Sequence, residues 1–438
     1  MDDQDTASIH LHQFHIQERQ RNKTLIKKLS HKLPALLGYA FERDKIIYTC
    51  IIALSLFRLI HQSLKYFLES SFIDLAYHYF YSSMVRLGLD LFDAQAIEKA
   101  KILIPIRYAG GEAVYSPSYF VIFQPLTCIP FGLLSAFWLS LCLFLVLLSL
   151  TWLFRTLHRF DSSLLVAFTA LLVGMYQPLY EDLVLGQNNS LILFLAVSTW
   201  YAFRYQKPWL SGFSIAAMAF IKIQFGFLLL FVLLLRQAKV FFISSLFWIV
   251  LFFIGLPELG FAHYERYLSA LLRHTSGVAT DLHNISLNAL WHRFFADDPN
   301  LATIVYSITS LILLSLVLFS CFKKKLHSNL ERAFIAGLTL IPLLSPHTEE
   351  HHLVPILLPL VFVSFYIQRM SFGMRFMYLI SVILIASRYS WIRLAPTNSI
   401  ILAPLLSLKI LGVLCLLIVV MNLTTSQSNL TNCQETSI

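Results

Sequence analysis

The chain of 438 residues carries few charges and much apolar surface, and this composition excludes most soluble functions. Hydrophobic residues make up 57% of it and charged residues 13%, whereas an ordinary soluble domain has about 25% charged residues. The mean hydropathy is +0.69. A formal charge of +9 would suit nucleic acid, but the basic residues lie mainly between apolar runs, where membrane topology explains them. We therefore expect an all-α polytopic membrane protein with no nucleic-acid partner.

Apolar runs recur along the chain from Lys45 onward, and most are long enough to cross a bilayer. About 20 helical residues span the roughly 30 Å of hydrocarbon. The two runs on either side of Lys222 are short for full spans and could form a shallow hairpin, and 118–130 suits an interfacial helix. The expected spans are 46–66, 131–154, 162–178, 188–204, 209–222, 223–236, 240–257, 301–321, 332–345, 353–368, 374–393 and 400–422.

The positions of Lys and Arg set the expected orientation of these spans. Most of the 33 lie in the N-terminal tail or in short loops on the same side as that tail, and such loops face the cytoplasm. Both termini are then inside, while the long loops 67–117 and 258–300 and the short loop 346–352 are outside. We expect three parts: a basic cytoplasmic tail over 1–45, one transmembrane domain over 46–424, and a short polar cytoplasmic tail over 425–438.

The outer segments hold residues that can carry chemistry. Asp74 follows the first span, where partial loss of water raises the pKa of a carboxyl group toward that of a useful base. Lys222 lies between two apolar runs, and a lysine there is costly unless it snorkels to the interface or meets an anion. Arg107, in the first outer loop, suits a lipid phosphate.

Other polar groups on the same side suit sugar hydroxyls or a phosphate, although each set also fits ordinary turn and cap chemistry. The segment 345–352 is the densest, but it has no HExxH pattern, and Pro346 breaks helix geometry near its start, so we expect no metal there. Asp74 is the candidate catalytic residue. The candidate substrate-binding residues are Arg107, Gln187, Asn188, Lys222, Asn284, Glu350, His351 and His352.

Several short motifs follow one another in a fixed order between about residues 70 and 365. They are Asp74-Leu75-Ala76-Tyr77-His78-Tyr79, Gly88 with Leu91-Phe92-Asp93, Tyr115-Ser116-Pro117, Gly186-Gln187-Asn188-Asn189, Gly212 through Lys222, Asn284-Ile285-Ser286-Leu287, and Ser345-Pro346 with His351-His352. In this order they resemble glycosyltransferase family 87, the polyprenyl-phosphate-mannose-dependent mannosyltransferases of the GT-C membrane fold. Departures from the family pattern at Ser116, Ile223 and Thr348-Glu349 leave the substrate open.

The resemblance implies a GT-C type glycosyltransferase with about 12 transmembrane helices. Its reaction would move a hexose, mannose by resemblance, from a polyprenyl-phosphate donor to a lipid or glycan acceptor on the non-cytoplasmic face. Asp74 would be the base of an inverting displacement, with Lys222, His351 or Arg107 on the phosphate. Because a phosphate leaving group needs cations and a monophosphate needs no bridging ion, we expect neither metal nor cofactor. The expected location is the bacterial cytoplasmic membrane, as a multi-pass protein whose site faces the periplasm.

Two other classes remain open. An O-antigen ligase or polymerase also has about twelve spans and a long outer loop with Arg and His. A polytopic transporter would show internal repeats and charged residues at the bilayer midplane, and the sequence has no clear repeat. Asp74 discriminates between these classes, because its loss would inactivate the glycosyltransferase and spare the other two.

Overall fold

The computed structural model is helical in almost every segment that it describes, and no strand occurs in those segments. The described residues are 44–65, 67–68, 72–106, 112–157, 162–277, 281, 283–323, 330–388 and 406–423. The two predicted tails therefore lie outside the described residues, apart from Asp44 and Lys45 at the start of the first helix, and so does Arg107.

The first half of the chain begins with one long helix and continues with mostly shorter ones. Proline stands in the first turn of α4, α7 and α9, where its missing N–H costs no hydrogen bond. In chain order the helices are Asp44–Lys65, α2 (Ile73–Arg86), α3 (Ala94–Leu103), α4 (Pro117–Phe123), the 3₁₀ helix η1 (Gln124–Cys128), α5 (Phe131–Thr156), α6 (Ser163–Met175), α7 (Gln177–Leu185), α8 (Asn189–Arg204) and α9 (Pro208–Ile221).

The helices of the second half pack against those of the first half and against one another. α9 packs between α8 and α11, and α20 packs against α16 and α18. The helices are η2 (Ile223–Gly226), α10 (Phe227–Leu234), α11 (Ala238–Phe253), α12 (Leu256–Leu259), α13 (Phe261–Gly277), α14 (Leu287–Phe294), α15 (Pro299–Lys323), α16 (Leu330–Leu344), η4 (Glu350–Ile356), α17 (Leu357–Ser364), η5 (Ile367–Arg369), α18 (Phe372–Ala386) and α20 (Leu408–Asn422).

Several helices are long and apolar enough to cross a membrane. Within the described ranges there are four, Asp44–Lys65, Phe131–Thr156, Ala238–Leu259 and Pro299–Phe322, and the bent pair α6–α7 would make a fifth. The other apolar helices have 10–17 residues, which is less than a full crossing needs. The protein is thus a helical membrane protein, but the predicted count of about twelve spans is not confirmed.

The two long outer loops predicted from the sequence are largely helical. Segment 67–117 contains α2 and α3, and 258–300 contains α13 and α14. In α13, Tyr264, Tyr267 and Ala270 are buried, and this spacing of three places them on one face of the helix. Polar sequence between spans therefore builds a packed helical layer rather than open loops.

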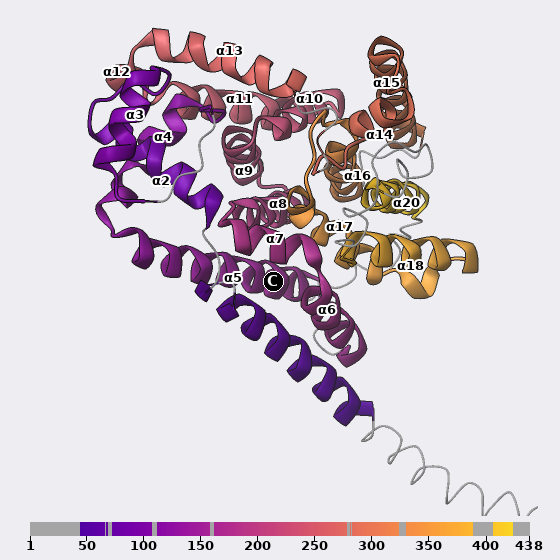
Figure 1. Cartoon of the computed structure of the whole chain (residues 1–438). Coiled ribbons are helices and arrows are strands. Elements are labelled where there is room, and N and C mark those ends of the chain that lie inside the picture. The colour runs from indigo at the N-terminus through magenta and orange to yellow at the C-terminus, as the bar shows by residue number, and fades with distance from the viewer. Residues whose placement is uncertain are drawn as a thin grey trace, which may run out of the picture.

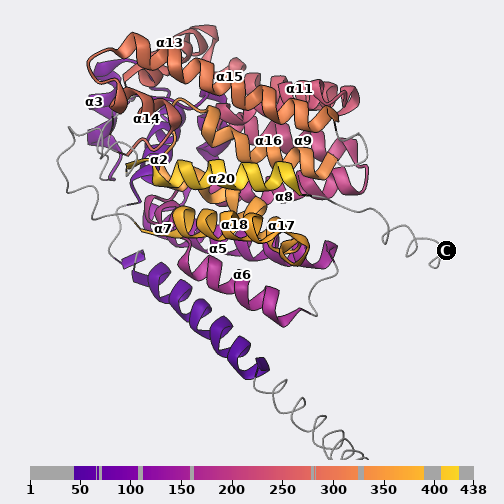
Figure 2. The same cartoon turned by 90° about the vertical axis from the view of Figure 1, so that its right-hand side faces the viewer.

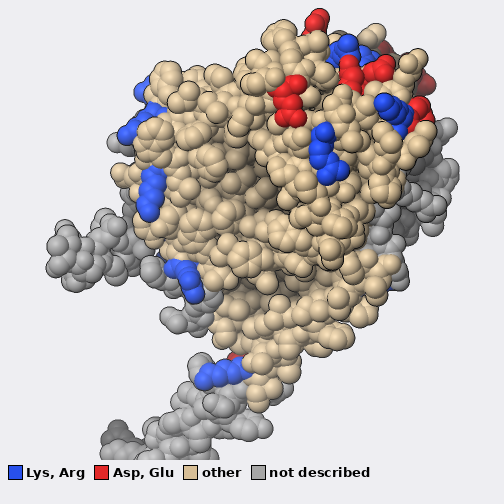
Figure 3. All heavy atoms as spheres, turned by 90° about the vertical axis from the view of Figure 1, so that its left-hand side faces the viewer, with Lys and Arg blue, Asp and Glu red and all other residues tan. Residues whose placement is uncertain are grey.

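The arrangement separates a charged end from an apolar flank. α13 lies along one end of the molecule, and the helix Asp44–Lys65 extends from the opposite side, next to α6 (Figures 1 and 2). On one face, acidic side chains and several basic ones gather near the end that carries α3 and α13, whereas most of that face is free of charge (Figure 3). This distribution suits a protein whose flank contacts lipid and whose one end contacts water.

Candidate active site

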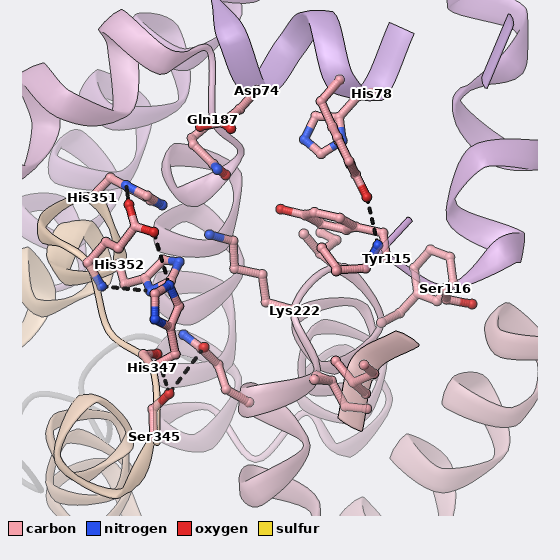
Figure 4. Close-up of a pocket in the computed structure, with 18 of the residues that line it drawn as sticks. Asp74, His78, Tyr115, Ser116, Gln187, Lys222, Ser345, His347, His351 and His352 are labelled. Carbon is pink, nitrogen blue, oxygen red and sulfur yellow. Dashed lines mark hydrogen bonds and ion pairs between the residues drawn. The ribbon is translucent and has the colours of Figure 1, made fainter. Parts of the chain in front are cut away.

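A cavity of about 380 Å³ forms where segments far apart in the sequence meet. One wall is α2, and the opposite wall is the loop between α16 and η4. The α7–α8 turn and the break between α9 and η2 lie between these walls, and Tyr115 and Tyr267 also line the space. Figure 4 shows side chains from these segments, among them Asp74, Lys222 and His351, around one cavity.

The α2 wall carries Asp74 and His78, which are four residues apart and therefore lie on the same helix face. Asp74 is in the first turn of α2, and its side chain is half-buried. His78 is fully buried, and neither of its ring nitrogens has a hydrogen-bond partner among the described residues. Its ring packs edge-on against Tyr115, with 4.7 Å between the ring centroids.

The surroundings of α2 shift the pKa values of both Asp74 and His78. Burial raises the pKa of Asp74 to about 6, although a hydrogen bond from Gln187 and the charge of Lys222 oppose the rise. Burial, with a smaller effect of the Lys222 charge, lowers the pKa of His78 to about 3. Near neutral pH, Asp74 is therefore an ionised carboxylate able to accept a proton, and His78 is uncharged.

The α7–α8 turn holds Gln187 against the start of α2. Asp182 fixes the turn, because its carboxylate accepts hydrogen bonds from the backbone N–H and side chain of both Asn189 and Ser190, at 2.7 to 3.2 Å. Gly186 ends α7 with φ +71°, and a Cβ there would lie 2.7 Å from Leu75 Cβ. Only glycine allows both this left-handed backbone and this close approach to α2.

We expect Gly186→Ala to destabilise the protein more than Gly88→Ala does. Both glycines have φ near +65° to +71°, but nothing lies within 4 Å of a Cβ built at Gly88. The left-handed backbone costs about 1–2 kcal/mol at either position, and the contact with Leu75 adds about 1–3 kcal/mol at Gly186 alone. Thermal unfolding of the two purified variants in detergent measures the difference. Equal melting temperatures would show that the turn does not need to approach α2 closely.

Lys222 lies at the break between α9 and η2, where the backbone becomes extended. Its side chain is only 8% exposed, and its Nζ has no hydrogen-bond partner in the part of the chain that the structure describes. The ammonium group interacts at longer range with Asp182, Asp74 and Glu349. In Figure 4 it points into the space between Gln187 and the histidines of the opposite wall. A buried amine left in this state is suited to binding an anion.

The loop between α16 and η4 is held in place by α14 and the residues before it. The Pro346 carbonyl accepts hydrogen bonds from the side chains of Asn284, Ser286 and Asn288, at 3.0 to 3.2 Å. Asn284 Oδ1 accepts a further bond from the Thr348 N–H. The loop is thus fixed by its neighbours before any ligand arrives.

Glu349 organises the histidines of this loop. Its carboxylate lies 2.9 Å from His347 Nε2 and 3.6 Å from His351 Nδ1. Burial alone would raise the pKa of Glu349, but the hydrogen bond from His347 and the neighbouring positive charges lower it to about 2. Burial and the charge of Lys222 lower the pKa of His351 to about 3. The Glu349 N–H donates to His352 Nδ1, which leaves His352 Nε2 to carry the proton and donate.

The structure brings five of the predicted site residues to the cavity: Asp74, Gln187, Lys222, His351 and His352. The predicted residues that do not line it are Asn188, Asn284 and Glu350. Their side chains contact protein groups: Asn188 Nδ2 donates to Tyr119 at 3.4 Å, and Glu350 lies 3.8 Å from the buried Lys409 amine. We place no substrate contact on these three residues.

The predicted site also leaves out several polar residues that line the cavity, among them His78, Tyr115, His347 and Glu349. His78 could have been predicted, because it follows Asp74 by one helical turn and would lie on the same face of a helix. The sequence alone does not indicate that Glu349 faces the cavity while its neighbour Glu350 faces Lys409.

Comparison with known proteins identifies the family of the chain. The family model of glycosyltransferase family 87 matches residues 113–346, just over half of the chain. The chain belongs to glycosyltransferase family 87. No curated protein and no solved structure matches it. The matched region of this glycosyltransferase includes Tyr115, Gln187 and Lys222, while Asp74 and the loop after Pro346 lie outside it and are joined to it by the cavity.

The cavity of this glycosyltransferase provides a base on one wall and a cation with neutral donors toward the other. Asp74 can take a proton from a hydroxyl, Lys222 can hold an anionic leaving group, and His352 can donate a hydrogen bond. Within the described ranges, no group of three or more His, Cys, Asp or Glu side chains is arranged to hold a metal ion. The absence of a metal requirement stays a prediction.

Proposed function

We propose that this enzyme transfers a hexose, mannose in the first instance, from a polyprenyl-phosphate donor to a lipid or glycan acceptor on the non-cytoplasmic face of the bacterial cytoplasmic membrane. The observation that carries the proposal is that one cavity is lined by Asp74 and by the buried Lys222, whose amine has no hydrogen-bond partner among the described residues. A carboxylate that accepts the acceptor's proton and a cation that holds the departing phosphate are the two groups this reaction needs.

In the proposed reaction, the acceptor hydroxyl attacks the anomeric carbon while its proton moves to Asp74. The bond from that carbon to the phosphate oxygen breaks, and the electron pair leaves with the polyprenyl phosphate. Lys222 offsets the charge that develops on this oxygen, so a general acid is not required. Attack from the side opposite the phosphate inverts the anomeric configuration. Family membership together with a base and a cation in one membrane-protein cavity supports a GT-C type enzyme over a transporter.

A transfer assay tests this proposal. Intact spheroplasts containing the protein are incubated with polyprenyl-phosphate mannose, polyprenyl-phosphate glucose or a nucleotide sugar, each labelled in the sugar, and the lipid and glycan fractions are counted. Because the proposed site faces the medium, we expect label to move from a polyprenyl-phosphate sugar and not from the nucleotide sugar. Transfer only from the nucleotide sugar would overturn the donor class.

We also expect the pH dependence of transfer to report on Asp74. Because its pKa is raised to about 6 and the ionised form must accept the proton, kcat/KM should rise as the pH increases through about 6. In Gln187→Leu this rise should lie at higher pH, since the hydrogen bond that lowers the pKa of Asp74 is lost. Gln224→Leu is the matched control, because Gln224 is a neutral amide in the same cavity that does not affect the pKa of Asp74. An equal shift in both variants would contradict the assignment.

A further inference from the structure

A second cavity, of about 530 Å³, shares no lining residue with the candidate active site. It lies between the helix Asp44–Lys65, the bend between α6 and α7, and the C-terminal end of α18. Its walls are mainly apolar and include Phe168 and Leu171 of α6 and Val382 and Ile383 of α18. All three elements are apolar: Asp44–Lys65 is long enough to span a membrane, the bent pair α6–α7 is so when taken together, and α18 is a shorter apolar helix. Hydrocarbon is the ordinary neighbour of such helices.

Two arginines, Arg58 and Arg388, stand among the lining residues. Both are exposed, and neither has a hydrogen bond or an ion pair with any residue that the structure describes. Gln62 and Gln177 also line the cavity, and no Asp or Glu is among its described lining residues. The polar end of this groove therefore carries two positive charges and no acidic side chain from the described part of the chain.

Arg58 is the more unusual of the two because of where it lies. It is about two thirds of the way along Asp44–Lys65, a helix apolar enough to span the membrane. An arginine within a span is costly unless it snorkels or meets an anion, and such residues are functional by default. A phosphate at the polar end of the groove would supply that anion.

The side of the helix that carries Arg58 is fixed by packing. Ser55, one turn earlier on the same face, is buried against Gly174 of α6. A Cβ at Gly174 would lie 3.0 Å from Ser55 Cβ, so a larger residue there would push the two helices apart by a few tenths of an ångström. The Gly174 carbonyl also accepts a hydrogen bond of 2.8 Å from Tyr180, which lines the same cavity. Arg58 is thus directed toward the groove rather than free to turn around the helix.

We propose that this second cavity binds a phosphomonoester-headed membrane lipid, with Arg58 and Arg388 on the phosphate and the hydrocarbon chain along α6 and α18. A phosphomonoester carries close to two negative charges at pH 7, which matches two guanidinium groups, and guanidinium suits phosphate oxygens because it offers paired N–H donors. A phosphodiester headgroup carries one charge and fits less well. The proposal concerns a site separate from the transfer cavity and holds whichever sugar or donor the enzyme uses.

The test measures lipid binding to the full-length protein in nanodiscs of neutral phosphatidylcholine. The probes are radiolabelled polyprenyl monophosphate, phosphatidic acid and phosphatidylglycerol; the first two are phosphomonoesters and the third is a phosphodiester. We expect a phosphomonoester lipid to bind at least about 10-fold more tightly than phosphatidylglycerol, and Arg58→Gln or Arg388→Gln to weaken that binding by about 10-fold or more. Binding of polyprenyl monophosphate alone identifies the reaction's lipid, and equal binding of phosphatidic acid identifies a bilayer lipid.

Two matched variants separate a built site from general attraction to basic residues. Arg155→Gln removes an exposed arginine of α5 that lies outside the groove, and it should leave binding unchanged. Leu171→Trp keeps both arginines but fills the apolar wall, and it should weaken binding as much as loss of one arginine. Equal binding of phosphatidylglycerol, equal effects of Arg58→Gln and Arg155→Gln, or full binding in Leu171→Trp would each overturn the proposal.

Discussion

Asp74→Asn is expected to lower the rate of sugar transfer by about 10²- to 10⁴-fold, the usual contribution of a positioned general base. The amide keeps the size of the side chain and its place on α2 but cannot accept the acceptor's proton. Removing a half-buried carboxyl group whose pKa is already raised to about 6 should not reduce stability. Initial rates with labelled donor, together with thermal unfolding of the same samples, separate the two effects.

Asp90→Asn is the matched control for this prediction. Asp90 lies in the same outer segment, but it does not line the cavity, and its carboxylate pairs with Arg266 at 2.6 Å on a partly exposed surface. Loss of such a pair costs about 1 kcal/mol or less, so Asp90→Asn should transfer sugar at nearly the normal rate. Normal transfer by Asp74→Asn would remove the assigned base and favour a ligase-like or transport function.

Lys222→Gln is expected to lower kcat/KM by about 10²- to 10³-fold, a loss typical of removing one group that stabilises developing charge. The same change should leave thermal stability unchanged or raised, because it removes a buried charge that has no hydrogen-bond partner among the described residues. Loss of activity combined with retained stability is the signature of a residue kept for its ligand. A structural lysine would show the opposite pattern, with lower stability and little specific loss of transfer.

Lys207→Gln is the matched control for Lys222→Gln. Lys207 is the N-cap residue of α9, at the opposite end of the helix from Lys222, and its amine lies over the Tyr201 ring outside the cavity. Its replacement should leave kcat/KM near normal. Equal losses of activity in both variants would show that the effect comes from helix α9 rather than from a cation in the site.

The positions of the long helices could be predicted from the sequence, because hydropathy is a property of neighbouring residues in the chain. Hydropathy fixed the positions of α5, α11 and α15, since long apolar runs form helices whatever surrounds them. The same signal does not fix the number of spans, because α9 and α10 are apolar but short and pack against neighbours such as α8 and α11. A hydropathy average does not distinguish a helix in contact with lipid from one buried in protein.

The candidate site, too, could be predicted from the sequence only in part. Asp74 and Lys222 stand out in the sequence because a charge beside apolar runs costs free energy of desolvation. Their functional role could therefore be predicted without knowledge of the fold. Only the tertiary structure decided which neighbours share their cavity. Three observations depend on contacts between distant segments. Glu349 lines the cavity and Glu350 does not, Asn284 donates a hydrogen bond to the Pro346 carbonyl, and Gly186 lies close to Leu75. The sequence by itself therefore determined the apolar helices and the unusual charged residues beside them. Packing determined the site, because a cavity forms between surfaces that come from different parts of the chain.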